Sequence, residues 1–147
     1  MTKPRTTQML SPLSTDLGLH RLLQAAGQAP SVLNTQPWRF HPISTGVLEL
    51  LADPARRLRV ADPRGRSLHV SCGAALFNLR LAVRMSGYRP VVWLLPDPAV
   101  PQLLATVRVA RSEPPNPLER ELYALIGRRR TNREPFENRR IPAPVMA

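Results

Sequence analysis

Two short polar segments carry the side chains best suited to binding chemistry. The first spans residues 29–40, APSVLNTQPWRF, and places Ser31, Asn34 and Gln36 on a turn that a proline stiffens at each end. Because amide side chains both donate and accept hydrogen bonds, Asn34 and Gln36 suit a heterocycle edge with alternating carbonyl and N–H groups, such as a flavin or a nucleobase. The alternative is that these side chains only satisfy turn backbone groups.

The second segment is strongly basic. Residues 128–133 read RRRTNR, which gives four arginines and one hydroxyl directly after a predicted helix. Guanidinium groups form strong, charge-assisted hydrogen bonds with phosphate, so this pattern is typical of a phosphate cradle. The alternative is a solvated charge run which, with Arg139 and Arg140, could form a nucleic-acid-binding tail.

The other chemistry-bearing residues show no catalytic or metal-binding pattern. The three histidines are scattered, and the single cysteine, Cys72, lies among small residues that favour a packing role. Three aspartates each precede a proline, which favours turns over acid–base catalysis: Asp53, Asp62 and Asp97. The glycines match no dinucleotide or P-loop motif.

Hydrophobic periodicity predicts the elements that must position these segments. Helices are expected at residues 17–26, 67–86 and 118–127, and strands at 38–43, 47–52, 88–95 and 103–109. The order α-β-β-α-β-β-α predicts an α+β layered fold rather than strict βαβ alternation.

The predicted helix at residues 67–86 is the most periodic stretch of the chain. One of its faces is expected to pack into the core, and it carries Val70, Gly73, Ala74, Phe77, Leu81 and Met85. Small residues on this helix, including Ser71 and Ala75, would allow a neighbouring element to pack closely.

Length and composition predict one soluble, cytoplasmic domain. The chain has 147 residues, 43% of them hydrophobic, and contains no apolar run long enough for a transmembrane helix and no secretory signal. Its formal net charge is +11, which favours an anionic partner such as nucleic acid, a membrane surface or a phosphorylated ligand. The single cysteine excludes an internal disulfide framework.

Together, the two polar segments resemble the nitroreductase family of flavin oxidoreductases. PSVLNTQPWRF is similar to the family signature P-S-x-x-N-x-Q-P-W-x-F, and RRRTNREPF is similar to a basic R-x-[ST]-x-[RK] segment. A narrower resemblance is to actinobacterial dormancy-associated (Acg-type) nitroreductase-like proteins, in which two nitroreductase-type halves are fused. Residues 29–39, 62–66, 72–76 and 129–136 resemble, in order, four motifs of their first half.

The resemblance implies a nitroreductase-like, helix-flanked mixed or antiparallel sheet that is incomplete in this chain. It implies FMN as cofactor and NAD(P)H as electron donor, with a nitroaromatic or quinone-type acceptor. Ser31, Asn34 and Gln36 would face the isoalloxazine ring. Arg129, Thr131 and Arg133 would hold the phosphate. Arg128 and Arg130 could substitute for them.

The resemblance also predicts the organisation of the chain. Residues 1–16 would form a flexible arm, 17–127 a half-domain, and 128–147 the phosphate-binding segment and the start of a missing second half. A homo-oligomer or a complementary second half would then complete the pocket.

Two rival functions remain open: a non-catalytic FMN-sequestering protein, and a basic module for nucleic acid or an acidic partner. Nucleic acid is disfavoured because the aromatic residues lie in apparent core elements: Trp38, Phe40, Phe77 and Tyr88.

Overall fold

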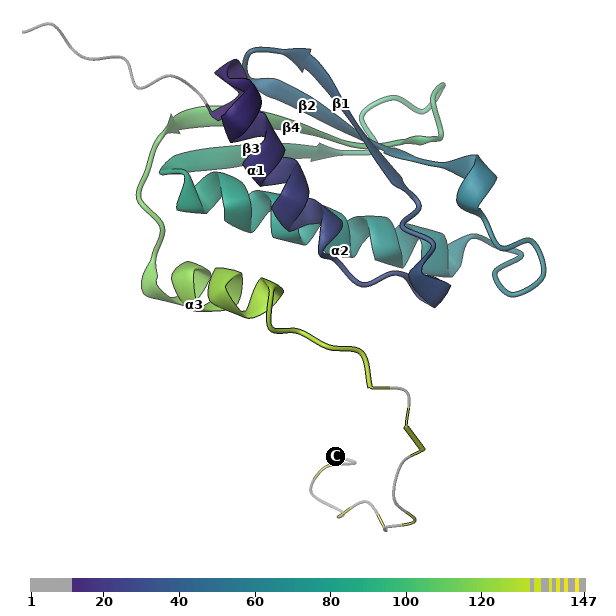
Figure 1. Ribbon diagram of the computed structural model, residues 1–147. Coiled ribbons are helices and arrows are strands. Elements are labelled where there is room, and N and C mark those ends of the chain that lie inside the picture. Colours follow the sequence, from purple (N-terminus) through teal and green to yellow (C-terminus); the bar gives the residue numbers. More distant parts are fainter. Residues whose placement is uncertain are drawn as a thin grey trace, which may run out of the picture.

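The chain folds into the predicted succession of helices and strands (Figure 1). A computed structural model describes residues 12–132 together with 134, 135, 138, 140, 142 and 145. Within these residues the helices are α1 (Asp16–Gly27), α2 (Arg66–Met85) and α3 (Pro117–Ile126). The strands are β1 (Trp38–Ser44), β2 (Val47–Ala52), β3 (Tyr88–Leu94) and β4 (Leu103–Ser112). The expected α+β class is confirmed. Most of the expected arm, residues 1–11, lies outside the described residues.

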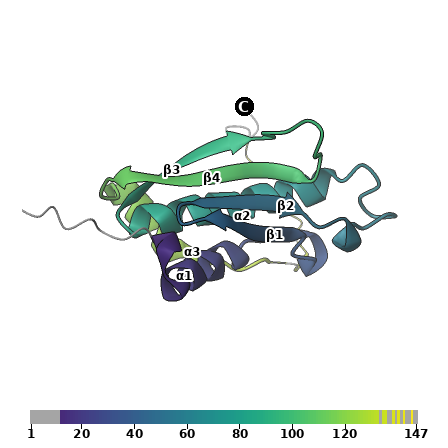
Figure 2. The same cartoon turned by 90° about the horizontal axis from the view of Figure 1, so that it is seen from above.

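The four strands form one antiparallel sheet in the order β1-β2-β4-β3. Of the two sheet types that the sequence left open, the described strands thus form the antiparallel one. The helices α1 and α2 cover one face of this sheet, and α3 packs against α2 (Figures 1 and 2). Figure 2 shows the opposite face of the sheet with no described helix across it.

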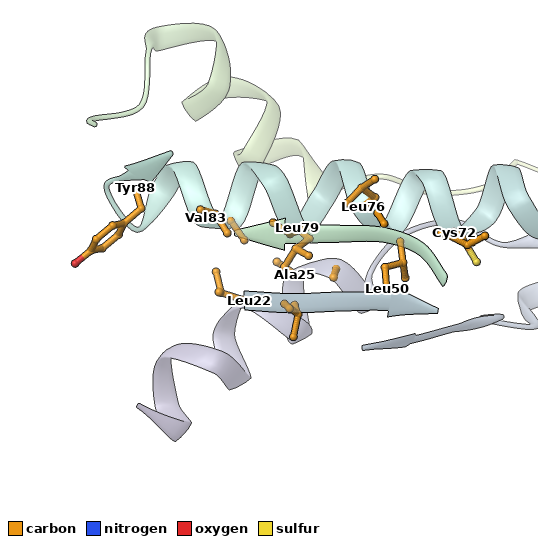
Figure 3. Close-up of a cluster of buried hydrophobic side chains, with 14 of the residues drawn as sticks. Leu22, Ala25, Leu50, Cys72, Leu76, Leu79, Val83 and Tyr88 are labelled. Atoms are coloured by element: carbon orange, nitrogen blue, oxygen red, sulfur yellow. The ribbon is translucent and has the colours of Figure 1, made fainter. Parts of the chain in front are cut away.

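The hydrophobic core lies between the sheet and the helices α1 and α2. Leu22 of α1, Leu50 of β2 and Leu79 of α2 are each only 1% exposed and converge there (Figure 3). Burying a leucine side chain contributes about 1.5–3 kcal/mol, so this cluster fixes the position of α2 under the sheet.

The buried face of α2 differs from the expected one. Val70, Phe77 and Met85 are exposed by 66%, 46% and 37%, and of the expected face Leu81 is the one large residue that is fully buried. The core instead takes another stripe at helical spacing: Leu68, Cys72, Leu76, Leu79 and Val83. Apolar residues occupy more than one side of this helix, so periodicity alone did not select the side that meets the sheet.

Aspartates before proline act as turn and cap residues, as expected. Asp53 Oδ1 accepts a hydrogen bond from Ala55 N at 3.0 Å, and Asp97 Oδ1 accepts one from Ala99 N at 2.8 Å. Asp62 caps α2, because its Oδ2 accepts from Leu68 N at 2.9 Å. The residue at the N-cap of α2 is a glycine with φ of +70°, which has no side chain for this task.

Candidate functional site

Residues 29–37, which we call the polar loop, bring the three predicted ring-facing side chains together. Ser31 Oγ accepts a hydrogen bond from Gln36 N at 2.9 Å, and Gln36 Nε2 approaches Asn34 Oδ1 at 3.5 Å. Ser31 and Gln36 are half-buried, and Asn34 is exposed. The Ser31 oxygen therefore does satisfy turn backbone, as the alternative interpretation held, whereas the two amides retain hydrogen-bonding capacity toward solvent.

The backbone of the polar loop is strained. Leu33, Asn34 and Gln36 have φ values of 47°, 58° and 48°, in the left-handed region that residues with a Cβ rarely adopt. Such conformations cost about 1–3 kcal/mol each and persist where the surroundings enforce them, often at ligand sites. The strained backbone places the Asn34 and Gln36 side chains next to each other.

Contacts with α2 hold one side of the loop. Ser71 Oγ accepts from Val32 N at 3.2 Å and donates to Ser67 O at 2.7 Å. One residue further along α2, Cys72 Sγ lies 3.4 Å from Pro37 O. Burial raises the pKa of the Cys72 thiol to about 11, so this group is a neutral, packed donor rather than a nucleophile.

The other side of the loop is held by the chain after β2. Asp53 N donates to Pro37 O at 2.8 Å, and an Arg56 guanidinium N donates to Thr35 O at 3.0 Å. Asp53 is itself fixed by Arg39, whose Nε lies 2.9 Å from Asp53 Oδ2. The loop is therefore clamped from two directions.

An apolar groove lies between the polar loop and the first turns of α2. It has a volume of about 250 Å³. Eight residues line it: Pro30, Ser31, Val32, Arg66, Ser67, Val70, Ser71 and Ala74. Among them, Arg66 is a cation that the sequence did not single out as a site residue. Arg66 is the first residue of α2. In the sequence it stands out only as the last residue of the segment 62–66 that resembles a family motif.

Next to Arg66, Asp62 fixes the start of α2. Burial raises the pKa of its carboxyl, but hydrogen bonds from the backbone N–H groups of Leu68, Ser67 and Arg66 outweigh this effect, and the net pKa is lowered. The ionised carboxylate thereby orients the helix turn that carries Arg66.

The basic segment after α3 brings together two of its three predicted phosphate ligands. An Arg129 guanidinium N donates to Thr131 Oγ1 at 3.0 Å, and both residues are exposed. Arg133 lies outside the described residues. The Arg130 guanidinium is turned back to the carbonyls of Gly127 and Arg129, at 3.1 and 2.9 Å.

The two segments start from neighbouring points but are not joined. A Cβ on Gly127, after α3, would lie 3.4 Å from Gln28 Oε1, which directly precedes the polar loop. Among the described residues no hydrogen bond or ion pair connects residues 128–132 with the polar loop. Figure 1 shows the chain leading away from the helices and sheet beyond α3.

The sequence is similar to named nitroreductases over most of its length. It is 40% identical over 126 residues to the Mycobacterium tuberculosis protein named "Putative NAD(P)H nitroreductase Rv3131", a match that covers 86% of this chain and 36% of the relative. It is 33% identical over 114 residues to the one named "Putative NAD(P)H nitroreductase acg" from the same species, covering 78% and 34%. This chain has a nitroreductase-like sequence. The expected resemblance, including that to the Acg-type proteins, is confirmed.

One solved structure shares the fold of the nitroreductase-like chain. A structure described as a "putative nitroreductase in complex with FMN" from Desulfovibrio desulfuricans matches with a TM-score of 0.52 and 23% identity, covering 84% of this chain and 87% of that one. No protein-family model matches the sequence. The nitroreductase-like chain spans about a third of the length of the curated relatives it matches. Across its described portion, no helix has the length and apolarity needed to cross a membrane.

Proposed function

We propose that this chain is an FMN-binding, nitroreductase-like oxidoreductase that uses NAD(P)H to reduce a nitroaromatic or quinone-type acceptor in the cytoplasm. The polar loop carries the proposal, because it gathers Ser31, Asn34 and Gln36 beside an apolar groove. The names of the curated relatives and the FMN complex of the structural neighbour support it.

The side chains at the loop fit a flavin in two respects. The neighbouring amides of Asn34 and Gln36 offer donors and acceptors to a ring edge, and the groove offers Val32 and Val70 as an apolar wall for a flat ring. Arg66 adds a positive charge at the rim of the same groove. Bound FMN supplies the redox chemistry, and the residues of the chain bind and orient it.

The basic segment supplies the proposed phosphate ligands. Arg129 and Thr131 already contact each other, and Arg133 follows two residues later in the sequence. Charge-assisted hydrogen bonds from guanidinium groups are worth about 1.5–3 kcal/mol each, so this group would dominate recognition of the phosphate end.

A second copy of the chain, or a complementary half, is the proposed partner that completes the pocket. Leu33 of the polar loop and Val70 of α2 are each 66% exposed beside the groove. Apolar side chains of this size at a groove rim favour coverage by another protein surface.

An FMN titration of the purified chain tests the proposal. Flavin absorbance and fluorescence give the affinity, and sedimentation velocity with and without FMN gives the oligomeric state. Arg129→Ala together with Arg133→Ala is expected to weaken binding by about 2–4 kcal/mol, from roughly 1.5–3 kcal/mol for each charged hydrogen bond with partial compensation. Asn34→Ala with Gln36→Ala is expected to weaken binding and shift the flavin spectrum, whereas Gln24→Ala, an exposed amide on α1, serves as the matched control.

Activity separates the enzyme from a sequestering protein. The FMN-loaded chain is mixed with NADPH and a nitroaromatic or a quinone, and nicotinamide oxidation is followed. Turnover supports the oxidoreductase, and tight FMN binding without turnover favours sequestration. A chain that binds no FMN at micromolar concentrations refutes both.

A further inference from the structure

A second cleft lies on the opposite end of α2 from the polar loop. It has a volume of about 430 Å³, within the range of small-molecule sites. It is bounded by the C-terminal half of α2, the start of β3, the linker that leads into α3, and α3 itself. Three arginines and two glutamates line it: Arg80, Arg84, Arg89, Glu113 and Glu119.

Arg84 forms the floor of the cleft, and its charge is already matched. Its side chain is 10% exposed, with Nε 2.8 Å from Glu119 Oε1 and Nη1 3.2 Å from Glu113 Oε1. Its other donors reach the carbonyls of Glu113 and Pro114, at 3.2 and 2.8 Å. The hydrogen bond with Glu119 raises the pKa of Arg84 and lowers that of Glu119. Both carboxylates are therefore held in place by the buried arginine.

Arg80 and Arg89 differ from Arg84. Both are exposed at the cleft, and within the described part of the chain neither guanidinium makes a side-chain hydrogen bond or an ion pair. Arg80 lies one helical turn before Arg84, and Arg89 is the second residue of β3, so the two guanidinium groups flank the same opening. Glu119 carries an electrostatic interaction with Arg80, but its oxygens are occupied by Arg84 and by the backbone N–H of Asn116.

Part of the cleft lining is apolar and includes an aromatic ring. Phe77 is 46% exposed and lines the cleft with Leu81 and Leu122. A flat ring can stack on a phenylalanine, and planar guanidinium forks bind phosphate in a bidentate way. The cleft thus pairs an apolar surface with two exposed phosphate-binding groups.

We propose that this cleft binds a nucleotide, in which a sugar links a phosphate monoester to an aromatic base. The phosphate would lie on Arg80 and Arg89 and the base against Phe77. The site is separate from the polar loop and does not depend on a flavin being bound there. The same chemistry is offered by a free mononucleotide and by the 2′-phosphate end of NADP⁺.

Calorimetric titration of the full chain with 5′-AMP tests the proposal. Saturable binding is expected, with adenosine and inorganic phosphate each binding at least tenfold more weakly than AMP. Arg80→Gln with Arg89→Gln is expected to lower AMP affinity at least tenfold. The matched control, Arg21→Gln with Arg64→Gln, removes the same charge from exposed positions outside the cleft and is expected to change affinity less than threefold.

Competition identifies the source of the nucleotide. Displacement of AMP by NADP⁺ but not by NAD⁺ assigns the cleft to the phosphorylated end of the dinucleotide, and displacement by neither assigns it to free mononucleotides. Asn34→Ala is expected to leave AMP binding unchanged, which separates this site from the flavin proposal. Absence of saturable AMP binding up to 10 mM overturns the proposal, as do equal losses in the cleft variant and its control.

Discussion

Ser71 is one of two residues through which α2 holds the polar loop, and replacing it by alanine tests that role. Its Oγ accepts from Val32 N at 3.2 Å and donates to Ser67 O at 2.7 Å. Each such bond is worth about 0.5–1.5 kcal/mol net, and an amide left without a partner costs about 1–3 kcal/mol when buried. Because Val32 is only half-buried, we expect the free energy of unfolding to fall by about 2 kcal/mol.

A second serine, at the C-terminal end of the same helix, provides the control. Ser86 Oγ donates to Ala82 O at 3.0 Å, the same four-residue spacing, but the loop makes no hydrogen bond to it. Ser86→Ala therefore removes the helix bond alone and is expected to cost less than about 1 kcal/mol. The difference between the two variants measures the bond to Val32.

Urea unfolding followed by tryptophan fluorescence gives both values. With a slope of about 1–3 kcal/mol per molar urea, the midpoint of Ser71→Ala is expected to fall by roughly 1 M. Hydrogen exchange of the Val32 amide is expected to accelerate in Ser71→Ala and not in Ser86→Ala. Equal midpoints for the two variants, with unchanged exchange at Val32, would refute the claim that Ser71 anchors the loop.

Two further predictions concern titratable groups. Because burial raises the pKa of Cys72 to about 11, the folded chain is expected to resist alkylation by iodoacetamide at pH 8, while the urea-unfolded chain reacts fully. Mass spectrometry measures the extent of alkylation. Rapid labelling of the folded chain contradicts the prediction. Because the pKa of Asp62 is lowered by folding, its stabilising effect is fully present above the ordinary aspartate pKa and is lost as the pH falls through the lowered value. Asp62→Asn is therefore expected to flatten the decline of the free energy of unfolding below about pH 4. Parallel curves of unfolding free energy against pH for the two proteins count against a stabilising role of the Asp62 carboxylate.

Much of the fold follows from local pattern. Helix and strand positions agree with expectation to within one residue at most ends, because glycines and prolines mark the boundaries and the short hairpin between β1 and β2 leaves little choice of partner. The turn signals do not determine the sheet order, in which β4 lies between β2 and β3. That order is a long-range property, decided by which faces bury the most apolar surface.

The face of α2 shows where local pattern is insufficient. The stripe that contains Val70 and Phe77 and the stripe that contains Cys72 and Leu79 both satisfy helical periodicity. Only packing against the sheet distinguishes them, because the second stripe lies in the same buried cluster as Leu50 of β2. Phe77, expected in the core, is half exposed and instead lines the second cleft, beside Arg80 and Arg84.

At the candidate site, residue types predicted the grouping of Ser31, Asn34 and Gln36 but not its cause. The left-handed backbone at Leu33 carries no sequence signal, since leucine rarely adopts it. Arg66 and the pair Arg80 and Arg89 reach their clefts through tertiary structure alone. The roles of Arg129, Thr131 and Arg133 stay predictions.

The left-handed residues of the polar loop also bear on the order in which the molecule assembles. Leu33, Asn34 and Gln36 would not hold these angles in an isolated peptide, so the loop can take its shape only after Ser71, Asp53 and Arg56 are in place. We expect the loop to be the last part of the chain to organise and the first to open. A population that is native by helix content can then still lack the ordered loop, so the FMN binding proposed for the loop would be a stricter measure of complete folding than circular dichroism.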